Sequence, residues 1–357
     1  ILISNAASLA AVALIGSEYL SQLIFATPAS DLSKSLIAML AVLVFYFVNL
    51  AGLRMSSKTQ NVLMLIKIAM VLILISALFF PGAESAAVSA PVVAGDSGFM
   101  ATITSFGVAL IAVSFTYGGY QQTINFGDEV KDARRTIPRG IFIGILVIIS
   151  LYLLVQMAYV HMIGFEELKT TRGIAAVVAE KMFGATGKTI FTLLLFMAVL
   201  AYVNVLLLSN PRVMYAMSRD RILPAIFART DQQRGVLTVS LTVFAAICII
   251  VLFFANTFEK ILGFTIFLDC IGMATSAATI FILRRRTRHL DGTGIYTMKL
   301  YPVLPLIFIA AYTFVGISIA VNTPVLALTG LIVFAVFLGL YFLVVRKRNN
   351  GEQEKTN

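Results

Sequence analysis

Ten long apolar stretches divide the chain, and their length constrains its fold more than any other feature. A helix needs about 20 predominantly apolar residues to cross the hydrocarbon core of a bilayer. Every backbone N–H and C=O group in lipid must be satisfied within the protein, so stretches of this length are predicted to be helices. The expected spans are 1–26, 35–53, 60–80, 99–126, 137–161, 187–210, 236–255, 259–283, 300–321 and 324–346.

The composition agrees with such a chain, because 59% of the residues are hydrophobic and only 12% are charged. Soluble domains are nearer half apolar and a quarter charged. We therefore expect an all-α polytopic membrane protein, with one transmembrane domain over 1–357. Signatures of nucleotide-binding loops, zinc proteases and serine hydrolases are absent from the sequence. We expect no enzymatic activity, no metal and no cofactor.

The basic residues alternate in abundance from loop to loop. Of the 27 Lys and Arg residues, 20 fall in the loops and tail on one side of the ten expected helices and six on the other. By the positive-inside rule, the richer side is cytoplasmic. This pattern explains the net charge of +10 as membrane topology rather than nucleic-acid binding. It predicts a cytoplasmic tail at 347–357, and we expect the cytoplasmic (inner) membrane of a bacterium.

Two local signals predict where helices end. Pro211 is expected at or just beyond a helix end, because proline lacks the N–H that continues the helix. The stretch 171–184 alternates apolar and charged residues. We expect it to form a short interfacial helix, separate from the span at 187–210.

Adjacent glycines interrupt the fourth expected span, in the segment FTYGGY at 115–120. Each weakens a helix by about 1 kcal/mol relative to alanine. Gly118 and Gly119 therefore suggest either a close helix contact or kink, or an unwound segment whose backbone faces a water-filled cavity. The residues alone leave both alternatives open.

Three segments resemble the amino acid–polyamine–organocation superfamily of transporters. FTYGGY, followed by DEVKDARRTIPRGI at 128–141, is similar to the sixth helix of that family. KTQNVLMLIKIAMVLILI at 58–75 resembles the fifth helix. NVLLLSNPRVMYAMSRDRILP at 204–224 resembles the eighth helix and the turn after it.

The resemblance implies a five-plus-five inverted-repeat fold and covers helices three to twelve of a twelve-helix transporter. Residues 1–80 would be the remainder of the first repeat, 99–283 the second repeat, and 300–346 two additional C-terminal helices. The expectation is that the first two helices, with a second glycine-rich break, are absent from this sequence.

The resemblance also implies a substrate site at the glycine pair. The carbonyls of Phe115 and Gly118 would face the ammonium group of the substrate, while Gly119 would permit the bend. The Phe115 ring would close over the substrate. Tyr117 and Gln121 would either line the cavity or pack between helices.

Three ionisable residues lie deep in expected spans, where such residues are costly. Lys67 either snorkels to the interface or, as the resemblance implies, supplies a cation where sodium-coupled relatives bind sodium. Asp269 would relay protons, recognise a cationic substrate, or be a hydrogen-bonded structural residue. Glu18 fits a solvated vestibule about two turns from the external end. Asn204 would either reach the cavity or form interhelical hydrogen bonds.

A charge cluster follows the interrupted span. Glu129, Arg134, Arg135 and Arg139 would form a cytoplasmic gate network, although charges beside membranes often only set topology.

We interpret the chain as a secondary active transporter of amino acids, proton-coupled or exchanging, that works by alternating access. Its expected partners are an amino acid or related amine, the lipid bilayer and, in the proton-coupled mode, protons. A polyamine or cationic amino acid antiporter of the same fold is the first alternative. A channel, a non-transporting membrane subunit or an inactive fragment is the alternative from another class.

Overall fold

The fold is built from helices throughout the part of the chain that the structure describes. This computed structural model describes residues 2–25, 29–82, 98–171, 173–254, 258–287, 298, 300–340 and 342. The helices, with η marking 3-10 helices, are α1 (Leu2–Ile24), α2 (Asp31–Leu50), α3 (Leu53–Ser76), η1 (Ala77–Phe79), α4 (Phe99–Thr116), η2 (Tyr120–Glu129), α5 (Ala133–Ile163), α6 (Phe165–Leu168), α7 (Ile174–Arg219), η3 (Ala225–Ala228), α8 (Thr238–Phe254), α9 (Phe258–Arg286), α10 (Val303–Asn322) and α11 (Pro324–Leu340).

Each predicted span corresponds to a helix of the structure. Seven helices in the described ranges are long and apolar enough to cross a membrane, and shorter apolar helices lie within α4, α8 and α11. The prediction of an all-α polytopic membrane protein is therefore confirmed. Much of the outer surface is apolar as well. On α5, for example, Phe142, Ile143, Leu153 and Met157 are exposed, which suits a surface that faces lipid.

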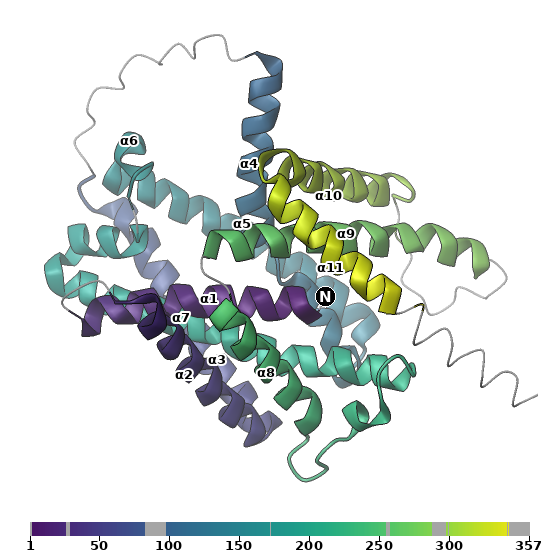
Figure 1. The fold of residues 1–357 in the computed structure, drawn as a ribbon. Helices are drawn as coiled ribbons and strands as arrows, with labels where there is room; N and C mark the ends of the chain where they lie inside the picture. The colour runs from purple at the N-terminus through teal and green to yellow at the C-terminus, as the bar shows by residue number, and fades with distance from the viewer. Residues whose placement is uncertain are drawn as a thin grey trace, which may run out of the picture.

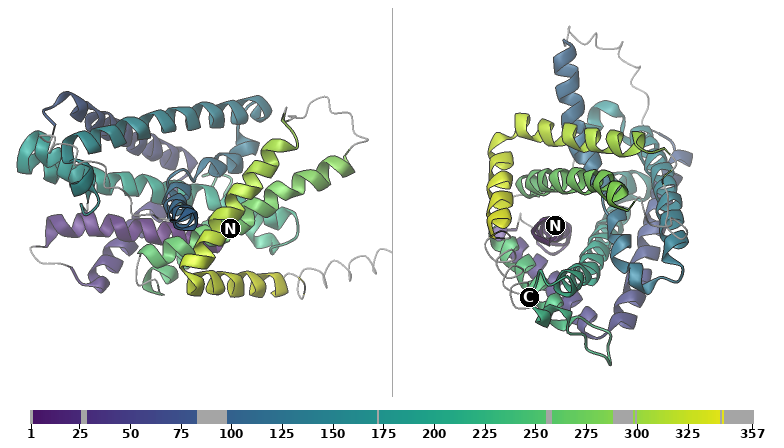
Figure 2. Two further views of the ribbon diagram at one scale, coloured as in Figure 1. Left: turned by 90° about the horizontal axis from the view of Figure 1, so that it is seen from above. Right: turned by 90° about the vertical axis from the view of Figure 1, so that its right-hand side faces the viewer.

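Helix α1 runs through the middle of the bundle, and the right-hand view of Figure 2 looks along it. It contacts α2, α7, α8 and α9. These helices approach closely because α1 buries small side chains, among them Ala6, Ala10 and Ala13. Small residues serve the same purpose in membrane helix packing generally. Helix α1 is thus a central support for the polar contacts described below.

Helix α4 is only partly packed against the rest of the molecule. Its first turns project from the bundle (Figures 1 and 2). Its second half lies against α9 and α10. There Leu110, Ile111 and Phe115 pack on a buried cluster that includes Val315 and Ile319. The end of α4 is therefore held in the bundle, and that end carries the predicted substrate site.

Helix α7 (Ile174–Arg219) contains the two helical segments that the sequence predicts. They meet at Gly184, where the backbone is not helical, with φ 71° and ψ −164°. Glycine adopts this positive φ without the steric cost that other residues meet. The prediction of a short helix before the span is therefore confirmed, while its interfacial position stays a prediction.

The prediction that Pro211 ends a helix is wrong, because α7 continues past it to Arg219. Proline removes the hydrogen bond to the carbonyl four residues earlier, which here is that of Leu207. The flanking side chains bond other carbonyls: Asn210 Nδ2 donates to the Leu206 carbonyl at 3.0 Å, and Arg212 Nη1 donates to the Leu208 carbonyl. Pro211 itself is buried, and packing against neighbouring helices lets membrane helices tolerate a proline.

Candidate functional site

Helix α4 ends in mid-span, so the single helix predicted over 99–126 is interrupted. The helix stops at Thr116. The N–H of Tyr117 then bonds the Val113 carbonyl at 3.0 Å, and the N–H of Gly118 bonds the Phe115 carbonyl at 3.2 Å. Gly119 has φ 107° and ψ −21°, in the left-handed region, and η2 follows. We call residues 117–119 the α4 break.

The two glycines of the α4 break are needed for different reasons. At Gly119 a side chain would meet nothing within 4 Å, but the positive φ is one that only glycine adopts readily. At Gly118 a Cβ would lie 3.2 Å from the Phe115 carbonyl oxygen. Gly118 therefore leaves room beside the exposed end of α4, where the helix dipole carries partial negative charge. Such an end attracts a cationic group such as an ammonium.

Aromatic side chains surround the α4 break. Phe115 is half-buried in the cluster formed with α9 and α10. Tyr117 is half-buried and packs edge-to-face on Tyr152 of α5, with ring centroids 5.2 Å apart. The Tyr152 hydroxyl donates to the Thr116 carbonyl at 3.4 Å. The structure thus brings Phe115, Tyr117 and both glycines together at one place, as the sequence analysis grouped them.

The segment η2 is an unusual continuation of the interrupted helix. It runs as a 3-10 helix over ten residues, whereas 3-10 runs longer than about four residues are uncommon because their hydrogen bonds are less favourable. Contacts with α7 hold it. Ser209 Oγ donates to Gln122 Oε1 at 2.8 Å, and the Arg212 guanidinium lies 4.6 Å from the centroid of the Phe126 ring.

Gln122 and Ser209 are not among the site residues predicted from the sequence. The available signal was the run of amide side chains directly after the glycine pair, which is unusual at membrane depth. The side chains of Gln121 and Glu129, which the sequence singled out, lie outside the described part of the structure.

Asn204 belongs to a buried network between helices rather than to the α4 break. Its side chain is fully buried. Asn204 Nδ2 donates to Gln60 Oε1 at 2.8 Å, and Asn49 Nδ2 donates to Asn204 Oδ1 at 2.9 Å. Ser56 Oγ donates to Asn49 Oδ1 at 2.8 Å. We call these four residues the asparagine network. It joins α2, α3 and α7, and it matches the interhelical alternative that the sequence left open.

Asp269 is held by helix α1. Ser4 Oγ donates to Asp269 Oδ1 at 2.6 Å and lies 3.4 Å from the Thr265 carbonyl oxygen. Two further polar pairs continue along the same helix towards α7. Ser8 and Tyr202 share a hydrogen bond of 2.6 Å between their hydroxyl groups, and Asn5 Nδ2 donates to Asn210 Oδ1 at 2.6 Å. The sequence singled out Asp269 but not these partners, because serine and asparagine in a span carry little individual signal.

Lys67 lies midway along α3 and is half-buried. Its ammonium group forms no ion pair with another residue of the described ranges. The role that the resemblance implies for Lys67 and the alternative of snorkelling to the interface both stay predictions.

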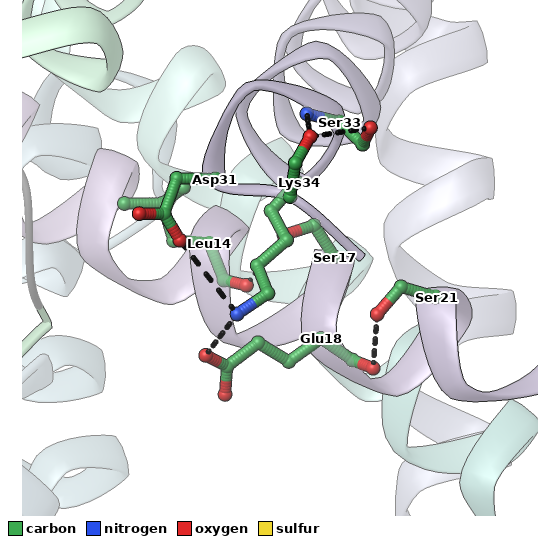
Figure 3. Close-up of polar contacts among 8 residues, drawn as sticks. Leu14, Ser17, Glu18, Ser21, Asp31, Ser33 and Lys34 are labelled. Atoms are coloured by element: carbon green, nitrogen blue, oxygen red, sulfur yellow. Dashed lines mark hydrogen bonds and ion pairs between the residues drawn. The ribbon is translucent and has the colours of Figure 1, made fainter. Parts of the chain in front are cut away.

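Glu18 lies near the end of α1 that faces the start of α2 (Figure 3). Lys34 Nζ is 3.5 Å from Glu18 Oε1 and 4.0 Å from Asp31 Oδ1, and the Glu18 side chain is 56% exposed. Exposed ion pairs of this kind contribute only about 0–1 kcal/mol. The pair fits a solvated position at the end of the bundle.

The arginines after η2 form no ion pair with a carboxylate among the residues whose side chains the structure describes, which do not include Glu129. Arg134, Arg135 and Arg139 are exposed. Within the described residues none of the three takes part in a salt bridge. The gate network suggested by the sequence therefore stays a prediction.

An apolar bundle with a helix broken in mid-span defines a class of membrane protein. Secondary transporters build their sites from discontinuous helices of this kind. The profile of the protein family described as "Amino acid permease" matches residues 1–351, and the chain belongs to that family. It is therefore an integral membrane protein of a transporter family rather than an enzyme family.

Curated relatives agree with this assignment. The chain is 26% identical to the "Serine/threonine exchanger SteT" of Bacillus subtilis (strain 168), over 68% of this chain and 56% of the relative. It is 23% identical to the human "Large neutral amino acids transporter small subunit 2", over 94% of this chain and 62% of the relative. It is 20% identical to the mouse "Asc-type amino acid transporter 1", over 67% of this chain and 44% of the relative. The chain thus spans less than two thirds of the length of these relatives.

Proposed function

We propose that this protein carries amino acids across a membrane by secondary transport, with the substrate bound at the α4 break. The observation that carries the proposal is the interruption of α4 at residues 117–119, inside a chain of the amino acid permease family. The end of α4 offers partial negative charge to the ammonium group of the substrate. Gly118 leaves space for close approach, and the rings of Phe115 and Tyr117 flank the site.

Alternating access follows from the same arrangement. The substrate would bind at the α4 break, near the middle of the bilayer, as it does at the discontinuous helices of inverted-repeat transporters. We take residues 1–80 as the remainder of the first repeat, 99–283 as the second repeat, and 300–346 as two additional helices. We place the loops and tail that hold most of the Lys and Arg residues on the cytoplasmic side of a bacterial inner membrane. Exchange is the coupling mode that we propose first, because the relative SteT is named an exchanger.

Proton coupling is the second candidate, and Asp269 favours it. Its carboxylate, on α9, accepts a short hydrogen bond from Ser4 of α1. A carboxyl group in this setting would take up a proton on one side of the membrane and release it on the other. The same group would instead pair with the substrate if the protein were a cationic amino acid or polyamine antiporter.

We propose that Lys67 allows transport without sodium. Its ammonium group would take the place of a bound sodium ion and favour one conformation of a two-state equilibrium. A strict sodium requirement in the full-length protein would contradict this role.

The experiment that tests the function is a counterflow assay on the full-length protein in liposomes. Liposomes are loaded with unlabelled serine, leucine, arginine or putrescine, or with buffer alone. The uptake of the same compound, labelled and added outside, is then followed in sodium-free buffer. We expect labelled serine or leucine to enter only when an amino acid is present inside. Uptake of arginine and putrescine alone would favour the antiporter alternative. Ion conductance without counterflow of any amine would overturn the proposal in favour of a channel.

A further inference from the structure

A cavity of about 810 Å³ lies at the end of the bundle where α7 ends and α3 begins. Its walls come from η2, the second half of α7, and the segment that leads into α8. This volume is within the range of about 300–1,000 Å³ that small-molecule sites have. The cavity is separate from the residues that were assigned to the α4 break.

The lining of this cavity combines apolar side chains with charged groups of both signs. Leu207, Leu208 and Leu241 contribute apolar walls. Arg212 and Arg219 both line it and are seven residues apart on α7, so they lie about two turns apart on one face of that helix. Arginine presents a planar group that binds a carboxylate through two parallel hydrogen bonds. Asp220, the residue after Arg219, also lines the cavity. The cavity therefore offers two cationic groups and one carboxylate, which suits a zwitterion such as an amino acid.

Each arginine lies beside an aromatic ring. The Arg212 guanidinium lies 4.6 Å from the centroid of Phe126 on η2, and the Arg219 guanidinium lies 5.9 Å from that of Tyr215. These contacts favour an orientation of the cationic groups along the cavity wall. Arg219 forms no ion pair with a carboxylate of the described residues. Its charge is thus available to a ligand.

The cavity is also connected to the α4 break through η2. Gln122, three residues after the α4 break, accepts a hydrogen bond from Ser209 of α7. Four residues further along η2, the Phe126 ring lies against the Arg212 guanidinium, which is three residues after Ser209 on α7. The two contacts advance in the same direction along η2 and α7. The arginines therefore lie on a line of residues that begins at the α4 break and ends in the cavity.

We propose that this cavity is a second binding station for the substrate, in which Arg212 and Arg219 hold the carboxylate of an amino acid before it reaches, or after it leaves, the α4 break. This inference rests on the proposed transport function. The station would increase the occupancy of the protein at low substrate concentration on one face only. It would therefore lower the half-saturating concentration on the face where the cavity opens.

The test is an exchange assay with the full-length protein in liposomes, using molecules of one known orientation. The half-saturating amino acid concentration is measured on each face, and the ratio of the cavity face to the opposite face is compared between variants. Loss of one hydrogen bond to a charged group corresponds to at least about a tenfold change in affinity. We expect Arg219→Gln to raise the ratio about tenfold, and Arg219→Lys to raise it less because the positive charge is kept.

Arg229→Gln is the matched control, because Arg229 is exposed in the same connecting region and does not line the cavity. We expect it to leave the ratio unchanged. Arg212→Gln should act in the same direction as Arg219→Gln, and the exposed Arg219 carries the test alone if the Arg212 variant does not fold. An unchanged ratio in Arg219→Gln, with transport intact, would overturn the station but not the transport function. Absence of exchange in the parent protein would instead overturn the function itself.

A second arm separates the substrate from a lipid headgroup, which would present similar anionic chemistry. The comparison is repeated in liposomes of phosphatidylcholine alone and with added anionic phospholipid. We expect the change in ratio to persist in phosphatidylcholine alone. An effect that requires anionic lipid would mean that the cavity holds a lipid headgroup, and would overturn the proposal.

Discussion

The asparagine network and the α4 break are both polar regions inside an apolar bundle, but they are built in opposite ways. In the network, Asn204 and Asn49 are buried and bonded to partners on three helices. At the break, the backbone passes through a positive φ at Gly119 that glycine adopts readily, and a side chain there would meet nothing within 4 Å. The network therefore fixes helices relative to one another, whereas the break leaves room for a substrate and for movement.

This contrast suggests a division of labour within the bundle. Buried polar groups that satisfy one another make a packing unique and rigid. Long 3-10 segments are less stable than α-helix, and η2 follows the break directly. We infer that α2, α3 and α7 act as the frame, that η2 is held on α7 by the Ser209–Gln122 and Arg212–Phe126 contacts, and that the α4 break is the flexible point between α4 and this frame.

The largest expected effect concerns Gly119. Gly119→Ala places a Cβ on a residue with positive φ, at a cost of about 1–2 kcal/mol, and should reduce exchange more than about tenfold by altering the path of the backbone. Gly164→Ala is the control, since Gly164 also has positive φ and open space but lies between α5 and α6. Both variants should lose similar stability, measured by thermal unfolding in detergent. Equal loss of exchange in the two would show that strain alone matters.

The second prediction concerns the network. Asn204→Leu leaves the partners of a fully buried amide unsatisfied, which costs about 1–3 kcal/mol for each group. We expect a lower thermal unfolding temperature, with the half-saturating substrate concentration of the remaining folded protein unchanged. A variant with the thermal unfolding temperature of the parent protein, but with substrate binding more than about tenfold weaker, would place Asn204 in the substrate site instead.

The third prediction concerns Asp269, which lies in neither region. Asp269→Asn keeps an acceptor for the Ser4 hydroxyl but exchanges no proton. If Asp269 relays protons, pH-driven accumulation should disappear while exchange at equal pH on both sides persists. If it is a counter-ion, both should fail for cationic substrates and survive for neutral ones. A variant that matches the parent protein in every assay would leave Asp269 as a structural residue.

The smallest effect is expected at the exposed end of α1. Glu18→Gln removes the ion pair with Lys34, where the Glu18 side chain is 56% exposed. Stability should fall by no more than about 1 kcal/mol, and exchange should be unchanged. Chemical denaturation and counterflow measure the two quantities. A strong loss of exchange would show that Glu18 contributes to coupling rather than to a solvated vestibule.

The sequence predicts the helices well because the thickness of the bilayer fixes their length. It predicts the end of α7 badly, because Pro211 lies inside a helix that continues to Arg219. Proline usually ends a helix, and composition does not reveal that Pro211 is buried among neighbouring helices, where membrane helices tolerate it.

The candidate site shows a similar division. Glycine at positions 118 and 119 signals a weak point in the helix, but it does not decide between a kink and an interruption. The pairs Ser209–Gln122 and Ser4–Asp269 depend on how helices far apart in sequence are rotated against one another. No local pattern encodes that rotation, so these partners emerge only from the tertiary structure.

The central claim is that substrate binds at the α4 break, and equilibrium binding to Gly118→Leu tests it most directly. The leucine side chain would fill the space beside the Phe115 carbonyl. The matched control is Gly140→Leu, because Gly140 lies in α5 and a side chain there meets nothing within 4 Å. With purified full-length protein and the labelled amino acid, we predict affinity at least about tenfold weaker for Gly118→Leu and unchanged for Gly140→Leu. Parental affinity in a folded Gly118→Leu variant would contradict the account, and would make Gly118 a packing glycine.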